Sequence, residues 1–149
     1  MNATLRIAKP GDRAGWEKLR SRLWPECPLE RHRLEIEQLL AGSGVVALAS
    51  VGKELVGLAE VSVRVDHVEG TTSAPVAYLE GWYVAEKFRG QGIGRVLLAF
   101  AEKWAAEHGF QELASDAELA NANSIRLHKT VGFREAGRSV HFVKSLTRE

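Results

Sequence analysis

The sequence predicts a single α/β domain of the α+β type, spanning residues 1–149, in which helices cover both faces of a central sheet. A chain of 149 residues can bury one substantial core without help from disulfides or metals. Residues 76–84 are nearly all apolar except Glu80, as expected of a central strand that is covered on both sides. Residues 92–108 place apolar side chains at helical spacing throughout, which predicts a long amphipathic helix.

The first part of the chain predicts two helices after a short strand. Residues 5–7 alternate as a strand, and the segment Pro10-Gly11-Asp12 ends it and supplies a helix N-cap. Two prolines in residues 24–28 force a loop after the first helix, and the second helix stops at Gly42. The apolar side chains of these two helices are Trp16, Leu19, Leu23, Ile36, Leu39 and Leu40.

The middle of the chain predicts an antiparallel pair of strands. Residues 45–51 form the first strand, Gly52-Lys53 the turn, and residues 55–68 a long second strand. The second strand alternates valines with polar residues, so we expect one buried face and one polar face. The valines are Val61, Val63 and Val65, and the polar residues are Glu60, Ser62, Arg64 and Asp66.

The last part of the chain predicts three more elements after Gly109 ends the long helix. A strand at residues 112–116 is followed by a helix at about residues 123–131 and a stop at Gly132-Phe133. A last strand at about residues 140–143 completes the chain.

Composition excludes several classes of function. With 20 Lys+Arg against 19 Asp+Glu the formal charge is +1, so no overall charge points to nucleic acid or an anionic membrane as a partner. The N-terminus lacks the features of a signal peptide, and no run of about 18 apolar residues predicts a membrane span. The lone Cys27 and the scattered histidines lack metal-ligand spacing. We therefore expect a cytoplasmic protein with a metal-free mechanism.

A glycine-rich loop, Arg89-Gly90-Gln91-Gly92-Ile93-Gly94, joins the apolar strand to the long helix. Without side chains, glycines let an anion approach backbone N–H groups closely, and the helix dipole adds about half a positive charge. This predicts a pyrophosphate site, although glycines at a helix start also serve simply as turn residues. No Lys-Ser/Thr follows as in a Walker loop, and a dinucleotide-binding fingerprint needs a different glycine order.

The loop resembles the acyl-CoA signature of the GNAT superfamily, Arg/Gln-x-x-Gly-x-Gly/Ala, at Arg89, Gly92 and Gly94. The order of elements over nearly the whole chain is also similar to a GNAT domain, which implies a mixed sheet with a splayed pair of strands and acetyl-CoA as co-substrate. Many members carry a tyrosine that protonates the departing thiolate; at that place this chain has His128, which is either the donor or a histidine on the helix surface. The implied cofactor contacts are Trp82, Tyr83, Val84, Arg89, Gly90, Gln91, Gly92, Ile93, Gly94 and Asn121.

The carboxylates in the sequence indicate which kind of molecule receives the acetyl group. Amide formation needs a neutral amine and a route for the proton that the amine loses. Glu80 stands in an apolar strand, so it faces either a cavity or a cationic partner, such as an arginine in an internal ion pair. Asp116 ends the next strand, near the reaction centre that the family implies, or serves as a turn residue. Further acidic residues flank the predicted cleft and suit a polycationic small molecule: Glu26, Asp66, Glu69 and Glu118.

Four stretches, at residues 23–26, 74–81, 83–84 and 114–117, are similar to the aminoglycoside 6'-N-acetyltransferases. That resemblance implies acetylation of an aminoglycoside at its 6'-amine and a homodimer. It makes Glu80, Asp116 and His128 the catalytic candidates, and it places the aminoglycoside against Trp24, Cys27, His67, Glu80 and Asp116. Trp24 is otherwise ordinary core, and Cys27 an inert small residue.

The chain departs from that family pattern at three places, which affect the preferred drug scaffold more than the reaction. Cys27 stands where histidine is expected, His67 where an aromatic residue is expected, and Gly137 where a carboxylate can occur. A GNAT for another amine and a non-catalytic acetyl-CoA-binding regulator remain the alternative functions.

Overall fold

The structure, a computed structural model, describes residues 2–147. Contacts divide this part of the chain into one unit that ends at Asp116 and a second that begins at Ala117. Each unit is described by itself, and one domain over residues 1–149 stays a prediction.

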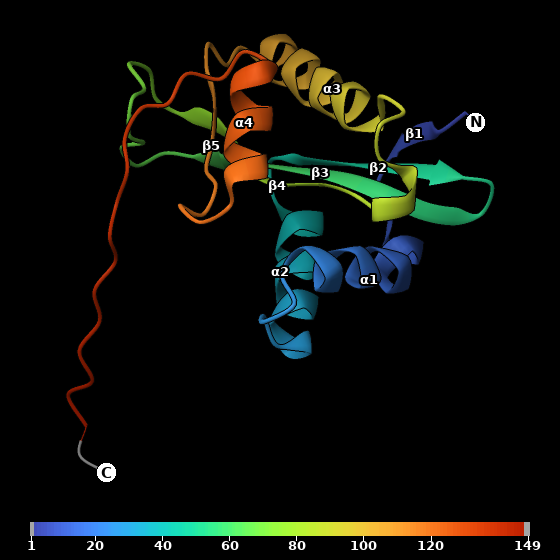
Figure 1. Cartoon of the computed structure of the whole chain (residues 1–149), viewed down its shortest axis with the longest axis horizontal. Helices are drawn as coiled ribbons and strands as arrows, with labels where there is room; N and C mark the ends of the chain where they lie inside the picture. Colours follow the sequence, from blue (N-terminus) through green and yellow to red (C-terminus); the bar gives the residue numbers. More distant parts are fainter. Residues whose placement is uncertain (1, 148–149) are drawn as a thin grey trace. The chain divides into compact units, whose positions relative to one another are not determined.

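The first unit is a mixed sheet with helices on both faces. Its strands lie in chain order: β1 (Thr4–Ile7), β2 (Val45–Val51), β3 (Glu54–Arg64), β4 (Val76–Val84) and β5 (Leu113–Ser115). Neighbours from β1 to β4 are antiparallel, whereas β5 runs parallel to β4. Helices α1 (Arg13–Leu23) and α2 (Leu29–Ala41) cover one face, and α3 (Ile93–Glu107) covers the other (Figure 1). The predicted fold class is confirmed.

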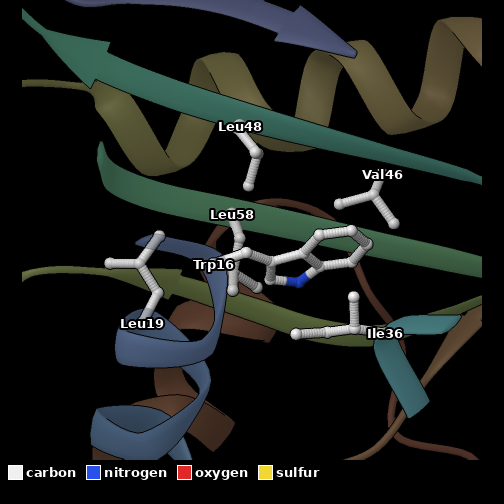
Figure 2. Packing of buried hydrophobic residues seen from close by; sticks show 6 residues of the cluster. All are labelled: Trp16, Leu19, Ile36, Val46, Leu48 and Leu58. Atoms are coloured by element: carbon white, nitrogen blue, oxygen red, sulfur yellow. The ribbon is translucent and has the colours of Figure 1, made fainter. Parts of the chain in front are cut away.

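Trp16 forms the centre of the core on the α1 side, and its side chain is fully buried. Helical spacing puts Trp16 and Leu19 on the face of α1 that meets the sheet. Each buried side chain of this size contributes roughly 1.5–3 kcal/mol relative to its exposed state, which holds α1 and α2 against β2 and β3. Figure 2 shows the cluster, which consists of Trp16, Leu19, Ile36, Val46, Leu48 and Leu58.

Strand β5 leaves β4 halfway along its length. The pairing of β4 with β5 ends where Leu79 meets Ser115, yet β4 continues to Val84 and keeps its pairs with β3 on the other side. Within the described residues, β4 and β5 thus pair only as far as Leu79. This confirms the splayed pair of strands.

A β-bulge at Glu80 changes the direction of the side chains on β4. Glu60 pairs with Gly81, whereas its neighbour on β3 pairs two residues earlier on β4, so Glu80 is an extra residue. In an unbroken strand Glu80 and Trp82 would point to the same face. Here Trp82 turns toward α3, and its Nε1 donates to the carbonyl of Gly94 at 2.9 Å, because a bulge shifts the alternation by one residue.

Two local expectations were wrong in the first unit. Strand β3 ends at Arg64 rather than at residue 68. Glu60, expected on the polar face of β3, is only 1% exposed, because α1 supplies a buried partner for its charge. The N-cap expected in residues 10–12 is confirmed, since Asp12 is the N-cap residue of α1. Its carboxylate accepts from the Arg6 guanidinium at 2.5 and 2.6 Å rather than from the backbone of the helix.

The second unit contains α4 (Ala122–Thr130), which confirms the helix expected at residues 123–131. The strand expected at residues 140–143 was wrong, since no strand is present in the described residues after α4. A strand needs partners for its backbone groups, and here Phe142 is 91% and Val143 98% exposed.

Nowhere in residues 2–147 is a helix both long and apolar enough to cross a membrane.

Candidate functional site

The start of α3 presents backbone groups that fit an anion. Gly90 and Gly92 both have left-handed backbone conformations, with φ of 80° and 86°, which residues with a Cβ rarely adopt. Gly92 is the N-cap of α3 and makes no side-chain cap, so the positive end of the helix dipole is not covered by a capping oxygen. A Cβ at either glycine would meet nothing within 4 Å. The loop therefore offers an open approach to a pyrophosphate.

The end of β4 leads to this loop. Trp82, Tyr83 and Val84 lie beyond Leu79, the last residue of β4 that pairs with β5, and they stay the expected contacts of a pantetheine arm. Arg89 connects the loop to the end of β4. Its Nε donates to the carbonyl of Val84 at 2.8 Å, and its guanidinium lies 5.4 Å from the centre of the Tyr83 ring. The residues expected to hold acetyl-CoA in the first unit are thus contiguous.

Of the two surroundings expected for Glu80, a cavity or a cationic partner, the structure shows a cationic partner, Arg64. Its carboxylate accepts from Arg64 at two places, Nε to Oε2 at 3.0 Å and Nη2 to Oε1 at 2.7 Å. The Ser62 hydroxyl donates to the same carboxylate. These bonds to Glu80 raise the pKa of the Arg64 guanidinium above its ordinary value. Glu80 therefore takes part in an ion pair at the bulge, with 29% of its side chain exposed.

Asp116 is joined to the same group of residues through Tyr78. The Tyr78 hydroxyl donates to the Asp116 carboxylate, and the Arg64 guanidinium carbon lies 3.4 Å from the centre of the Tyr78 ring. Burial, followed by the hydrogen bond to Asp116, raises the pKa of Tyr78 well above its usual range. Tyr78 is thus a neutral donor at physiological pH, and Arg64 links the two candidate carboxylates.

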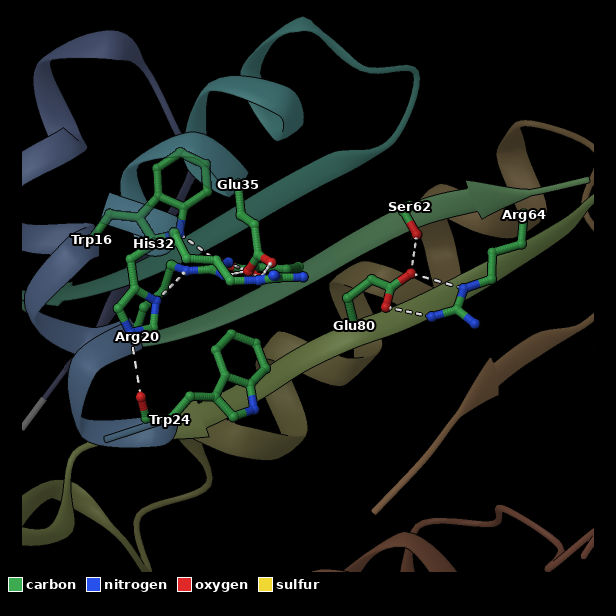
Figure 3. Close-up of polar contacts among 10 residues, drawn as sticks. Trp16, Arg20, Trp24, His32, Glu35, Ser62, Arg64 and Glu80 are labelled. Carbon is green, nitrogen blue, oxygen red and sulfur yellow. Dashed lines mark hydrogen bonds and ion pairs between the residues drawn. The ribbon is translucent and has the colours of Figure 1, made fainter. Parts of the chain in front are cut away.

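Trp24 lies beside this group, at the end of α1. Its ring packs over Gly81, where a Cβ would come within 2.8 Å of the ring atom Cη2. The Arg20 guanidinium lies 4.7 Å from the centre of the Trp24 ring. Figure 3 shows Trp24 near Arg20 and near the strand that carries Glu80. The ring is partly buried, so it can serve both as packing and as a wall of the site.

A buried charged network supports this wall. Arg20, 2% exposed, donates through Nη1 to both carboxylate oxygens of Glu60, at 2.6 and 2.8 Å, and it also donates to Glu35. Trp16 donates to Glu60 through Nε1 at 2.7 Å. Burial raises the pKa of the Glu60 carboxyl, against the opposing attraction of Arg20. The network fixes the last turns of α1 to β3.

His32 connects the same network to the Trp24 backbone. Its Nδ1 accepts from Arg20 Nε–H at 3.1 Å, so Nδ1 carries no hydrogen and the ring is the Nε2–H tautomer. Nε2 then donates to the carbonyl of Trp24 at 3.3 Å. His32 is fully buried, so both the ring and the carbonyl of Trp24 have fixed neighbours.

The other predicted substrate contacts lie at the surface. His67 is exposed and lies 4.0 Å from Glu69, and Cys27 is partly exposed with its Sγ 3.7 Å from the carbonyl of Pro28. Glu26 and Asp66 are exposed as well. Among the described residues, none of them bonds to Glu80 or Asp116, and their contact with substrate stays a prediction. Within residues 2–147 no three His, Cys, Asp or Glu side chains are arranged to hold a metal ion.

Two predicted site residues belong to the second unit. The Asn121 side chain caps α4 by accepting from the N–H of Ser124 at 3.0 Å. His128 Nδ1 lies 2.7 Å from the carbonyl of Ser124, which can only accept, so Nδ1 carries the hydrogen. The ring also packs against Phe133, 5.1 Å between centres. These two contacts fix the orientation of the ring.

Residue patterns missed Arg64, Tyr78 and the buried network. One signal was available for Arg64: an acidic residue in an apolar strand requires a cationic partner, and Arg64 is a basic residue on the adjacent strand. Tyr78 carried no such signal, because a tyrosine in a buried strand is usually core. Arg20 and Glu60 lie 40 residues apart, so only the fold brings them together.

Comparison with known proteins gives the family. The chain matches the acetyltransferase (GNAT) family over residues 13–133. It is 45% identical over 143 residues to aminoglycoside N(6')-acetyltransferase type 1 of Stenotrophomonas maltophilia, covering 93% of this chain and 91% of that one. A protein of the same name from Serratia marcescens is 44% identical over 133 residues, covering 88% and 91%.

Solved structures agree with the sequence comparison. AAC(6')-Iy in complex with the bisubstrate analogue CoA-S-monomethyl-acetylneamine has a TM-score of 0.90 at 31% identity, covering 97% of this chain and 99% of that one. An aminoglycoside 6'-N-acetyltransferase from Acinetobacter haemolyticus, in its apo form, has a TM-score of 0.89 at 34% identity, covering 99% and 100%. This chain belongs to the GNAT acetyltransferase family and, within it, to the aminoglycoside 6'-N-acetyltransferases.

Proposed function

We propose that this chain transfers the acetyl group of acetyl-CoA to the 6'-amine of an aminoglycoside and so confers resistance to the antibiotic. The observation that carries the proposal is the placement of two carboxylates, Glu80 and Asp116, where β5 leaves β4. The named relatives and the structure with a CoA–aminoglycoside bisubstrate analogue support this choice of substrate.

The glycine loop and the β4 edge are the proposed cofactor site. When bound, acetyl-CoA supplies a thioester whose carbonyl carbon the amine attacks, with cleavage of the C–S bond. Residues 89–94 hold the pyrophosphate through backbone N–H groups and the α3 dipole. Trp82, Tyr83 and Val84 hold the pantetheine amides, and Asn121 in the second unit supports the CoA arm.

The two carboxylates are proposed to bind and deprotonate the amine. An aminoglycoside amine arrives as an ammonium group, which Glu80 and Asp116 attract before one of them, directly or through water, accepts its proton. The Tyr78 hydroxyl donates a hydrogen bond to the Asp116 carboxylate and so helps to orient it. Trp24 forms a wall for the sugar rings. His128 is the proposed donor of a proton to the departing thiolate.

The central experiment measures CoA release against tobramycin, kanamycin, spermidine and N-terminal peptides. Asp116→Asn keeps the shape of the side chain and removes its charge, so kcat/KM for tobramycin should fall roughly 10- to 100-fold, the scale of a charge-assisted hydrogen bond worth ~1.5–3 kcal/mol. Glu80→Gln should do the same, with a larger share in kcat if Glu80 accepts the proton. Acetyl-CoA affinity should hardly change in either variant.

Glu102→Gln is the matched control, because it removes one negative charge from an exposed position of α3. It should retain the parental kcat/KM. If Glu80→Gln and Asp116→Asn also acetylate tobramycin at parental efficiency, the carboxylate site is wrong. Turnover of spermidine or peptides alone would favour a GNAT for another amine. Binding of acetyl-CoA without CoA release from any of them would favour a regulator.

We further propose that the protein is a cytoplasmic homodimer. Apolar side chains near the C-terminal end of the chain are exposed, and a second copy would remove them from water. They are Val140, Phe142, Val143 and Leu146. Light scattering should report a dimer at micromolar concentration, with a shift toward monomer for Phe142→Ser. A parent chain that is monomeric across that range contradicts the proposal.

A further inference from the structure

Arg64 contacts both parts of the proposed substrate site. It bonds both oxygens of Glu80, at 3.0 and 2.7 Å. Its guanidinium also stacks 3.4 Å from the centre of the Tyr78 ring, and Tyr78 donates to Asp116. One arginine therefore occupies the place next to Glu80 that an ammonium group would take.

This ion pair is of a kind that a ligand can open. The side chains of Arg64 and Glu80 are 42% and 29% exposed, and exposed pairs contribute little because water and salt screen them. The pair of Arg20 with Glu60 differs, since those side chains are 2% and 1% exposed. Separating the buried pair would leave two buried charges without a counter-charge. Arg64, by contrast, can move into solvent on its long side chain.

We infer that Arg64 competes with the ammonium groups of the substrate for Glu80, and that it thereby sets how much positive charge a ligand must bring to the site. A singly charged amine merely exchanges one cation for another at Glu80. A polycation has further ammonium groups for Asp116 and compensates for the displacement of Arg64. The inference rests on the proposed function and assigns to Arg64 the selection of polycationic substrates.

The experiment is a calorimetric titration of the full chain with tobramycin. Arg64→Met removes the competing cation and keeps most of the side-chain length, so the dissociation constant should fall by about 3- to 10-fold, the scale of one exposed ion pair with a cation–π contact. Arg64→Lys keeps the charge and should stay close to the parental affinity. Glu80→Gln in the Arg64→Met background should abolish the gain, because the two residues act as a unit.

Arg13→Met is the matched control. Arg13 also bonds both oxygens of one carboxylate, that of Glu37, in an exposed pair at 2.6 and 2.9 Å, but this pair joins α1 to α2 and includes no residue of the proposed site. Its loss should leave tobramycin affinity unchanged. An equal gain in Arg13→Met would show a general charge effect and overturn the role of Arg64.

Unchanged or weaker tobramycin binding by folded Arg64→Met also overturns the inference, and weaker binding would mean that Arg64 orients Glu80. Should Arg64→Met not fold, Arg64→Gln takes its place in the same titration with the same expected gain. CoA release is measured separately. If the parent chain binds tobramycin without acetylating it, the proposed function is contradicted and the inference is not. If the parent acetylates tobramycin but Arg64→Met shows no gain in affinity, the inference is contradicted and the proposed function is not. A parent that neither binds nor acetylates tobramycin removes both.

Discussion

Glu60→Gln tests whether the buried network holds α1 to the sheet. The Glu60 carboxylate accepts three N–H bonds, two from Arg20 and one from Trp16, at 2.6–2.8 Å. A glutamine of the same shape offers one acceptor oxygen, and its NH₂ group must face another donor. Arg20 would also keep a buried charge without its main partner. Breaking such a pair costs about 3–5 kcal/mol.

Urea unfolding followed by tryptophan fluorescence measures this cost. With a slope of about 2 kcal/mol/M, typical of a small protein, the midpoint should fall by about 1.5–2.5 M. Glu37→Gln is the control, because it removes a carboxylate from an exposed arginine pair and should leave the midpoint nearly unchanged. Equal midpoints for Glu60→Gln and Glu37→Gln would refute the reasoning, since burial is what makes the first pair costly to break.

Three further predictions concern the site. Gly92→Val should raise the acetyl-CoA dissociation constant sharply, because valine both resists the φ of 86° and blocks the approach of an anion; unchanged calorimetric affinity in a folded variant would remove the loop from the site. His128→Phe should lower kcat with little effect on aminoglycoside KM, since proton donation develops in the transition state; equal turnover would leave His128 as a surface residue. Tyr78→Phe should not lower the phenolate absorbance of the folded protein at pH 11, because the raised pKa keeps Tyr78 protonated there. The stability that the Tyr78 hydroxyl contributes is fully present below the unfolded pKa near 10 and is lost as the pH rises from there through the higher folded pKa. A drop in absorbance at pH 11 contradicts this assignment.

Sequence patterns alone predicted the elements that carry strong periodic signals. Strand β4 was expected at residues 76–84 and lies there, because a continuous apolar run needs cover on both sides. Helix α3 and the glycine loop before it were equally clear. The helix follows from the spacing of its own apolar residues, and the loop from glycines that adopt left-handed conformations. The failed strand at residues 140–143 shows the limit of this reasoning, because a β-pattern forms a strand only where a partner supplies hydrogen bonds.

The candidate site divides in the same way. Glu80 stood out in the sequence because a charge in an apolar strand needs a partner. Asp116 stood out because it follows a strand, in a stretch that resembles the aminoglycoside 6'-N-acetyltransferases. The sequence could not show that a one-residue bulge at Glu80 turns Trp82 toward α3, since bulges depend on the register of two strands. It also gave no sign that Tyr78 would donate to Asp116 from 38 residues away.

The sequence by itself thus determined the order of elements as far as α4, the position of the glycine loop and the family, because these depend on local spacing and on contiguous motifs. Only the tertiary structure decided which charges meet. It buried Glu60 with Arg20, left Arg64 exposed on Glu80, and placed Trp24 over Gly81. The physical reason is that the energy of a charge depends on its burial and on its nearest counter-charge, and both are set by segments that lie far apart along the chain.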